Sequence, residues 1–189
     1  MMFSSGGMLT GSEIERQVEK GNIIISNFNK DQLNPNSYNL KLHPQLLIYQ
    51  KSPLDMKRKN RTTELMIPKE GLVLQPGVLY IGRTVERTAS DKYIPMINGR
   101  SSTGRLGLSI HVCAGFGDIG FDGTWTLEIT VVEPVRIYPN LEVAQVCFFK
   151  PVGKVDNLYR GRYYKQVDAT ASRIHLPKKD ESKFLGMDN

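Results

Sequence analysis

The sequence predicts an all-β fold, a barrel or a sandwich, with one short helix near the N-terminus. From about residue 65 onward, short apolar runs of strand type recur at brief intervals, and turn residues such as Gln75-Pro76-Gly77 separate them. The chain is also rich in turn formers, with 17 Gly and 10 Pro among 189 residues, a length that fits one domain. The expected strands cover residues 71–88, 92–97, 106–112, 123–132, 135–139 and 143–152.

The N-terminal part supplies the helix and two earlier strands. Thr10 and Glu13 have the spacing of a helix capping box, and Gly21 can end the helix that they begin. Residues 22–28 form an apolar run, and residues 33–50 alternate between apolar and polar side chains. We expect a strand from each of these two segments.

Three segments organise the chain. Residues 8–152 hold the predicted β domain, in which the charged residues 51–64 form a solvent-facing loop or hairpin. We set residues 1–7 apart as an N-terminal extension, because the sequence from Met8 already has the character of a natural start. Residues 153–189 are polar and basic without a clear period, and we expect this C-terminal segment to be either disordered or ordered by a ligand.

Composition narrows the class of protein. The formal net charge is +6 and the pI is near 9.3, but the basic residues are scattered and many alternate with acids, which favours a solvated surface over a nucleic-acid face. No run is long enough for a membrane span, and the N-terminus lacks the features of a signal peptide. The two cysteines, Cys113 and Cys147, are too few for a disulfide framework, so we expect reduced thiols and a cytoplasmic protein.

Residues 99–107, GRSSTGRLG, gather many hydrogen-bond donors on little side-chain bulk. The segment lacks the order of a Walker A loop. Hydroxyls at Ser101 and Ser102 and guanidinium groups at Arg100 and Arg105 can nevertheless hold phosphate oxygens. The alternative is a tight turn whose arginines form salt bridges with nearby acids, and the segment alone leaves both interpretations open.

Residues 111–128, HVCAGFGDIGFDGTWTLE, place two carboxylates near an aromatic ring. Asp118 lies in a glycine-rich hairpin with Phe121 three residues later, and Glu128 follows on the next strand. Strand alternation puts Glu128 on the face opposite Leu127 and its other apolar neighbour. The Glu128 carboxylate can serve as a general base, or it can simply belong to a solvated strand face.

Taken together, these segments resemble the deoxycytidine triphosphate deaminases of the trimeric dUTPase superfamily. The resemblance extends from about Met8 to Ile174, and Asn39 departs from it because an aspartate is often found at that position. It implies a distorted jelly-roll-like β barrel of the dUTPase type, homotrimers with nucleotide sites at subunit interfaces, and dCTP as substrate. The blocks that carry it, in order, are GRSSTGRLGL, HVCAGFGDIGFDG, TLE, Gln145 and YRGRYYKQVDATASRI.

The resemblance also implies a role for each site residue. Phosphates would be held by the Arg-Ser-Ser segment, with Ser101 and Arg105 also positioning the reacting water and the base. Asp118 would accept from the sugar hydroxyl, Phe121 would pack where a ribose 2′-OH would otherwise lie, and the C-terminal segment would close over the triphosphate as a mobile lid. The full nucleotide-binding set is Arg100, Ser101, Ser102, Thr103, Gly104, Arg105, Ala114, Asp118, Phe121, Thr126, Leu127, Glu128, Gln145, Tyr159, Arg162 and Gln166.

The implied chemistry is hydrolytic deamination at C4 of cytosine, with Glu128 moving a proton from water to the departing ammonia. No zinc is expected, because the H-x-E and P-C-x-x-C motifs of the zinc deaminases are missing and the three histidines are isolated. We interpret His111 as a structural strand residue rather than a catalyst. A Mg²⁺ ion is expected, bound through the substrate phosphates rather than in a protein cage.

The product is a separate question. Gly115-Phe116 and Gly104 resemble the dUMP-forming branch, whereas Arg162 and the ATASRI ending depart from its pattern. We predict dUMP, with a dUTP-forming deaminase and a plain dUTPase as alternatives. A nucleotide-sensing or interaction module on the same barrel is the non-enzymatic alternative, and regulation by dTTP stays open.

Overall fold

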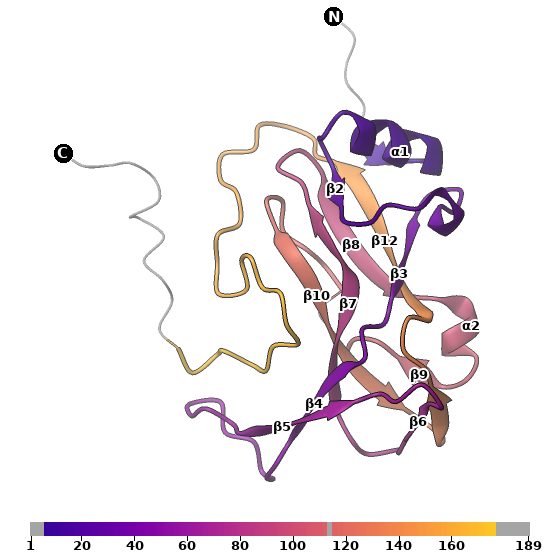
Figure 1. Ribbon diagram of the computed structural model, residues 1–189. Helices are drawn as coiled ribbons and strands as arrows, with labels where there is room; N and C mark the ends of the chain where they lie inside the picture. Colours follow the sequence, from indigo (N-terminus) through magenta and orange to yellow (C-terminus); the bar gives the residue numbers. More distant parts are fainter. Residues whose placement is uncertain (1–5, 113–114, 177–189) are drawn as a thin grey trace, which may run out of the picture.

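The computed structural model describes residues 6–112 and 115–176, and these residues form a β barrel with short helices at its surface (Figure 1). The elements, in chain order, are β1 (Gly7–Met8), α1 (Gly11–Glu19), β2 (Ile24–Ile25), the 3-10 helix η1 (Lys30–Gln32), β3 (Tyr38–Lys41), β4 (Gln45–Tyr49), β5 (Thr62–Met66), β6 (Leu72–Leu74), β7 (Tyr80–Ala89), β8 (Ile94–Gly99), α2 (Ser101–Gly104), β9 (Leu108–Ser109), β10 (Asp122–Val131), β11 (Val135–Ile137) and β12 (Glu142–Lys150). The predicted all-β class with one short N-terminal helix is confirmed.

Antiparallel pairing builds the barrel. In the described residues, β12 pairs with β8 on one side and with β3 and β1 on the other, while a second sheet runs β5-β4-β7-β10-β9 with β2 beside β7. A short pair of β6 and β11 completes the strands. Side chains from both large sheets meet in one apolar core, including Leu40 and Phe148 from the first and Leu46 and Leu127 from the second, all of them essentially inaccessible to solvent.

Local sequence signals explain where α1 begins and ends. The hydroxyl of Thr10 accepts a hydrogen bond from the Glu13 backbone amide at 3.3 Å, as the predicted N-cap requires. The Glu13 carboxylate completes no capping box and instead binds Arg16 on the next turn. Gly21, just beyond the helix, has a φ of +69°, a conformation that a residue with a Cβ rarely adopts.

Several predicted elements are shorter than their sequence patterns. The run 22–28 contributes only Ile24–Ile25 to a sheet, and the run 33–50 divides into β3 and β4 around Pro44, which has no amide hydrogen for a ladder. The charged segment is exposed over residues 51–59, but its last residues enter β5. At the N-terminus, Gly7 pairs with Lys150, so the last residue of the segment set apart as an extension contributes to the sheet.

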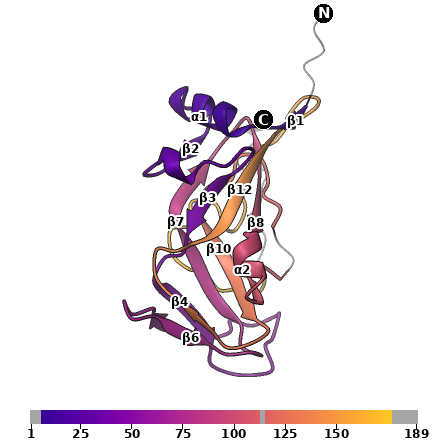
Figure 2. The ribbon, with the colours of Figure 1, turned by 90° about the vertical axis from the view of Figure 1, so that its right-hand side faces the viewer.

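The C-terminal segment packs along one side of the barrel. Residues 151–176 descend beside β10 and β7, on the side of the barrel opposite α2 (Figures 1 and 2). In the part of the chain that the structure describes, this segment contains no helix or long strand. It is joined to β10 by an isolated parallel β-bridge between Gly123 and Gln166. The predicted site residues of the C-terminal segment and those of α2 (Ser101–Gly104) therefore lie on opposite sides of the barrel.

Candidate active site

A cavity of about 560 Å³ lies between β10, β4, β7 and the C-terminal segment. Most of its surface is apolar or aromatic, with a few polar groups, as is usual for small-molecule sites. Its lining residues are Tyr49, Leu79, Ile81, Val112, Phe116, Gly117, Asp118, Phe121, Trp125, Thr126, Glu128, Tyr159, Tyr163, Gln166, Thr170 and Ser172. Six predicted site residues (Asp118, Phe121, Thr126, Glu128, Tyr159 and Gln166) and Phe116 of the predicted Gly115-Phe116 pair are thus brought to one cavity.

Glu128 is placed by the alternation of β10. Leu127 and Ile129 point into the core and are each 1% exposed, whereas Glu128 and Thr126 lie on the other face, which confirms the predicted orientation. One oxygen of the Glu128 carboxylate accepts a hydrogen bond of 3.1 Å from the Val112 backbone amide. This bond fixes the carboxylate at the cavity wall and leaves its other oxygen without a protein partner in the described residues.

The turn before β10 brings Asp118 and Phe121 to the same cavity. The Phe121 amide donates to the Asp118 carbonyl at 3.1 Å, and the Phe121 ring packs on Trp125 with the ring centroids 4.5 Å apart. Gly120, within this turn, has a φ of +87°, and a Cβ there would lie 2.7 Å from the Cβ of Leu158. Glycine at this position therefore lets the C-terminal segment approach the turn closely.

Gln166 closes the cavity from the C-terminal segment. Its side-chain amide donates to the Thr124 carbonyl at 2.8 Å and to the Thr126 hydroxyl at 3.2 Å. Its side-chain oxygen is buried and has no hydrogen-bond partner in the described residues, so it keeps an acceptor free beside the cavity. Tyr159 stands nearby, with its ring centroid 6.3 Å from that of Phe121, and burial raises the pKa of its phenol, which favours the protonated form that can donate.

The tyrosines that hold the end of this segment were not among the predicted site residues. The Tyr49 hydroxyl on β4 accepts from the Ser172 amide, and the Tyr163 hydroxyl accepts from the Arg173 amide, both at 3.1 Å. Both tyrosines line the cavity. Tyr163 belongs to the aromatic cluster of the C-terminal block and so had a local signal, whereas Tyr49 is 123 residues from its partner and had none.

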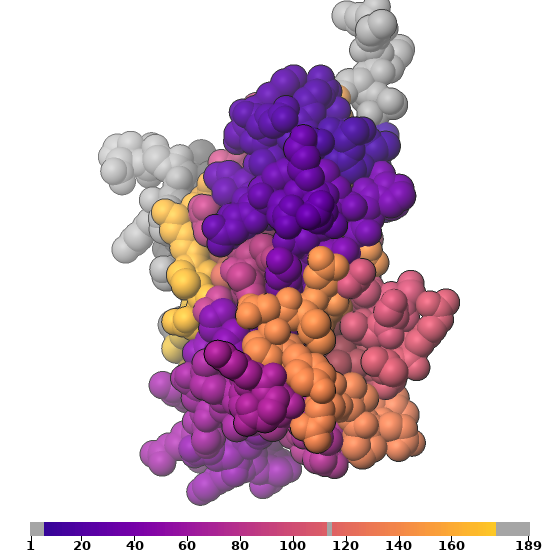
Figure 3. All heavy atoms as spheres, turned by 45° about the vertical axis from the view of Figure 1, so that its right-hand side comes forward, coloured from indigo at the N-terminus to yellow at the C-terminus, as the bar shows by residue number. Residues whose placement is uncertain are grey.

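The Arg-Ser-Ser segment forms the short helix α2, which was not predicted as a helix. Ser101, Ser102 and Arg105 are exposed, and their side chains have no hydrogen-bond partner among the described residues. The space-filling view shows α2 protruding from the surface beside β12 (Figure 3). A second cavity, of about 540 Å³, is lined by Asn98, Gly99, Arg100, Ser101, Gly104, Gly107, Leu108, Ser109, Ile110, His111 and Val132.

Arg100 behaves differently from Arg105. Its guanidinium forms an ion pair with Glu142, with 2.9 Å between Nη1 and Oε2, which matches the alternative prediction of arginines paired with acids. Thr103 bonds the Arg100 carbonyl at 2.8 Å, within α2. His111 lies just beyond β9, not within a strand as predicted.

The two cavities share no lining residue; α2 lines one and the C-terminal segment lines the other, and these two segments lie on opposite sides of the barrel (Figures 1 and 2). Gln145 lines neither of them; it donates to the Gly99 carbonyl at 3.1 Å. Arg162 lines neither and donates to the Leu176 carbonyl at 2.9 Å.

Leu127 points into the core, and Gly115 accepts from the Ile97 amide. Ala114 and Cys113 lie outside the described residues, whereas Cys147 is buried as a free thiol.

Two further observations concern other classes of site. Within residues 6–112 and 115–176, no helix is long and apolar enough to cross a membrane. In the same ranges, no three His, Cys, Asp or Glu side chains are grouped closely enough to hold a metal ion by themselves.

Comparison with known proteins agrees with these features. A family model described as dCTP deaminase-like matches residues 8–151. The chain is 53% identical over 167 residues to a protein of Hathewaya histolytica named dCTP deaminase, dUMP-forming. This alignment covers 88% of this chain and 96% of the relative. It is 53% identical over 156 residues to a protein of the same name from Clostridium acetobutylicum, and this alignment covers 82% of this chain and 90% of the relative.

A solved structure supports the fold. The crystal structure of 2′-deoxycytidine 5′-triphosphate deaminase from Agrobacterium tumefaciens aligns with a TM-score of 0.63 at 21% identity, over 77% of this chain. The aligned chain spans about half, 49%, of that longer protein. Given the match of the family model over most of its length and relatives at 53% identity, the chain belongs to the dCTP deaminase-like family.

Proposed function

We propose that this chain is a hydrolase of nucleotide metabolism that deaminates dCTP at C4 and then releases diphosphate, so that dUMP is the product. The relatives at 53% identity carry the name dCTP deaminase, dUMP-forming, and they match nearly their whole length. The structural observation that carries the proposal is the Glu128 carboxylate, held by the Val112 amide at the wall of a largely apolar cavity of nucleotide size. The Gly115-Phe116 pair agrees with the dUMP-forming names.

In the first step, the free oxygen of Glu128 takes a proton from a water molecule beside the pyrimidine ring. The hydroxide adds to C4, and the same carboxyl group returns the proton to the departing amino group, so dCTP and water become dUTP and ammonia. Ser101 and Arg105 position the water and the base. In the second step, water attacks the α-phosphate, Asp118 or a neighbour orients it, and diphosphate leaves.

The remaining residues hold the nucleotide. Asp118 accepts from the sugar hydroxyl, and the Phe121 ring occupies the space that a ribose 2′-OH would need. Tyr159 and Gln166, which both line the cavity, close over the triphosphate from the C-terminal segment. Thr126 presents its backbone to the pyrimidine edge.

We further propose a homotrimer in which each site combines α2 of one protomer with the Glu128 cavity of its neighbour. In a single chain these two groups lie on different sides of the barrel, and their cavities have no residue in common. Cyclic symmetry repeats such a contact and closes the ring. Exposed apolar side chains beside the two groups, among them Val112, Phe116 and Val132, supply surface that a neighbouring protomer would cover.

Magnesium would enter with the substrate. Mg²⁺ is commonly held by substrate phosphates with one or two carboxylates, and the Asp118 carboxylate at the cavity wall is compatible with an ion bound through the phosphates of dCTP. When bound, the ion neutralises charge on the triphosphate. We also propose a cytoplasmic protein, with dTTP as an inhibitor because it carries the same triphosphate and deoxyribose.

Product analysis tests this proposal. Purified protein is incubated with dCTP and Mg²⁺, and ammonia, dUTP, dUMP and diphosphate are resolved over time. We expect ammonia, dUMP and diphosphate to appear in equal amounts. Ammonia with accumulating dUTP would remove the second step, and a protein that hydrolyses only added dUTP would contradict the deaminase assignment.

A further inference from the structure

We propose that Trp125 is a positioning residue for the discrimination between deoxyribose and ribose. Its indole, held by the Thr88 hydroxyl, packs on the Phe121 ring and prevents that ring from moving aside for a 2′-OH. This inference rests on the proposed function and deepens it, because it names the residue on which the contact between Phe121 and the sugar depends.

Phe121 is held between two aromatic rings. Its ring centroid lies 4.5 Å from that of Trp125, with 36° between the ring planes, and 6.3 Å from that of Tyr159. Trp125 and Phe121 both line the Glu128 cavity, yet they are only 6% and 8% exposed. Because side chains in such a close-packed region have no void to enter, the Phe121 ring cannot shift toward β10 without moving the indole.

A buried hydrogen bond fixes the indole. The Trp125 Nε1–H donates to the Thr88 hydroxyl at 2.9 Å, and Thr88 is 1% exposed. Since an indole N–H can only donate, moving the ring away would leave a buried donor unpaired, which opposes the movement. Thr88 lies on β7 and lines neither cavity, so its hydroxyl affects sugar selection only through Trp125.

The backbone of Trp125 is held at an irregular part of the sheet. The pairing of β10 with β7 shifts its register between Thr124 and Thr126. In this stretch, the Trp125 amide donates to the Thr84 hydroxyl at 3.0 Å, and that hydroxyl donates to the Glu86 carbonyl at 2.8 Å. Irregularities of this kind re-aim a side chain, and here the side chain is directed to the cavity wall.

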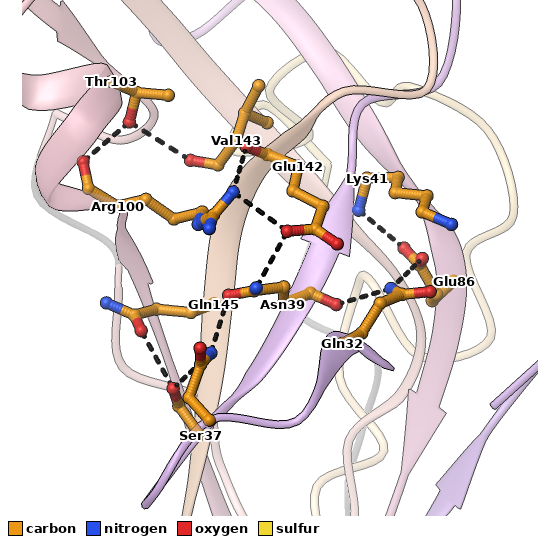
Figure 4. A network of polar contacts seen from close by, with 11 residues as sticks. Gln32, Ser37, Asn39, Lys41, Glu86, Arg100, Thr103, Glu142, Val143 and Gln145 are labelled. Atoms are coloured by element: carbon orange, nitrogen blue, oxygen red, sulfur yellow. Dashed lines mark hydrogen bonds and ion pairs between the residues drawn. The ribbon is translucent and has the colours of Figure 1, made fainter. Parts of the chain in front are cut away.

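Glu86 ties this irregular stretch to the interior of the barrel. Its carboxylate accepts from the Gln32 side-chain amide at 3.0 Å and from the Lys41 backbone amide at 2.9 Å (Figure 4). Glu86 and Gln32 are each 2% exposed, so both bonds are shielded from water. Strand β7 is therefore anchored to β3 and η1 next to the point where it supports Trp125.

Gly117 provides the room that the indole needs. A Cβ at this position would lie 2.4 Å from Cη2 of Trp125 and 2.9 Å from the Pro95 carbonyl oxygen. The Gly117 amide donates to the same carbonyl at 3.0 Å, which fixes the loop at this distance. The residue that follows is Asp118, the expected partner of the sugar hydroxyl, so the indole contacts the backbone on both sides of that carboxylate.

Substrate preference tests the proposal. Thr88→Val removes the hydroxyl and keeps the side-chain shape, Trp125→Phe removes the N–H and keeps an aromatic ring, and Thr62→Val on β5 is the matched control, which lines neither cavity. We expect the ratio of kcat/KM for dCTP to that for CTP to fall about fivefold in Thr88→Val and about tenfold in Trp125→Phe, chiefly because CTP is used better. The control should keep the wild-type ratio.

A purely structural role predicts another pattern. Both substrates would then lose equally and the ratio would stay at the wild-type value, which would overturn the proposal. Thermal melts of all variants check that the fold is intact.

A double variant tests whether the indole acts through Phe121. Phe121→Leu alone should lower the dCTP preference, and adding Thr88→Val should lower it no further, because the ring that the indole supports is already gone. If the double variant lost the product of the two single effects, Trp125 would act independently of Phe121 and the positioning role would be refuted.

Fluorescence provides a readout that needs no turnover. Trp125 is the only tryptophan among the 189 residues, so the emission reports on this indole alone. Titration of Glu128→Gln protein with dCTP should change the emission, with a Kd at least about tenfold below that for CTP, and adding Thr88→Val should bring the two Kd values closer together. Unchanged emission at dCTP saturation, verified by calorimetry, would refute the place of the indole at the sugar wall. A wild-type protein that binds dCTP without turnover would refute the proposed function alone, because the ratio of Kd values still tests the role of Trp125.

Discussion

Two inactive variants should restore activity to each other if the active site is shared between protomers. Ser101→Ala damages the group on α2, and Glu128→Gln removes the proton shuttle on β10, which lies at the other cavity. In a mixed trimer, a site is intact when its α2 comes from the Glu128→Gln chain and its Glu128 from the Ser101→Ala chain. Every ring of three that contains both chains has one such site among its three, so isolated mixed trimers should show about one third of the wild-type activity.

The assay compares ammonia release from dCTP for each variant alone and for variants expressed together with different affinity tags. Sequential purification on both tags isolates mixed trimers, and their activity is measured beside that of the wild type. As a control, two differently tagged copies of Ser101→Ala are mixed and should stay inactive. No recovery in verified mixed trimers would refute the shared site and would place Ser101 and Glu128 in one chain's site.

Three other outcomes follow from the structure. Phe148→Ala, which empties a fully buried position on β12, should lower the free energy of unfolding by about 4 kcal/mol, measured by urea denaturation. Burial and the nearby Arg83 lower the pKa of His43 from its ordinary value of 6.5. Below about pH 6.5 the unfolded chain therefore binds more protons than the folded protein, and stability falls as the pH falls through this range. His43→Gln should weaken the decline in melting temperature between about pH 7.5 and 5.5, and an unchanged decline would contradict this prediction. Phe121→Ala should reduce the preference for dCTP over CTP, as a ratio of kcat/KM values, by about tenfold, and equal losses on both substrates would argue against contact with the sugar.

Features that depend on neighbouring residues could be predicted from the sequence. The start of α1 follows from Thr10, four positions before Ile14, the first apolar residue of the buried face, and the orientation of Glu128 follows from the two-residue period of β10. The dUMP-forming assignment came from the short Gly115-Phe116 signal, and it agrees with the names of the relatives.

Features that depend on contacts between residues far apart in the chain could not be predicted from the sequence. The partner of Arg100 lies 42 residues further along the chain, and no local pattern distinguishes Arg100 from Arg105 in residues 99–107. Tyr49 reaches its partner across 123 residues. The sequence also could not show that the site residues divide between two sides of the barrel, because this separation arises only when β8 and β10 take their places in different sheets.

In the proposed reaction, Glu128 moves the proton during deamination. Glu128→Gln keeps the size of the side chain and an oxygen that can accept from Val112, and it removes only the base. We predict that ammonia release from dCTP falls by at least about a hundredfold while dCTP still binds, measured in single turnovers beside the exposed control Glu64→Gln. A Glu128→Gln protein that releases ammonia at the wild-type rate would show that Glu128 is not the proton carrier.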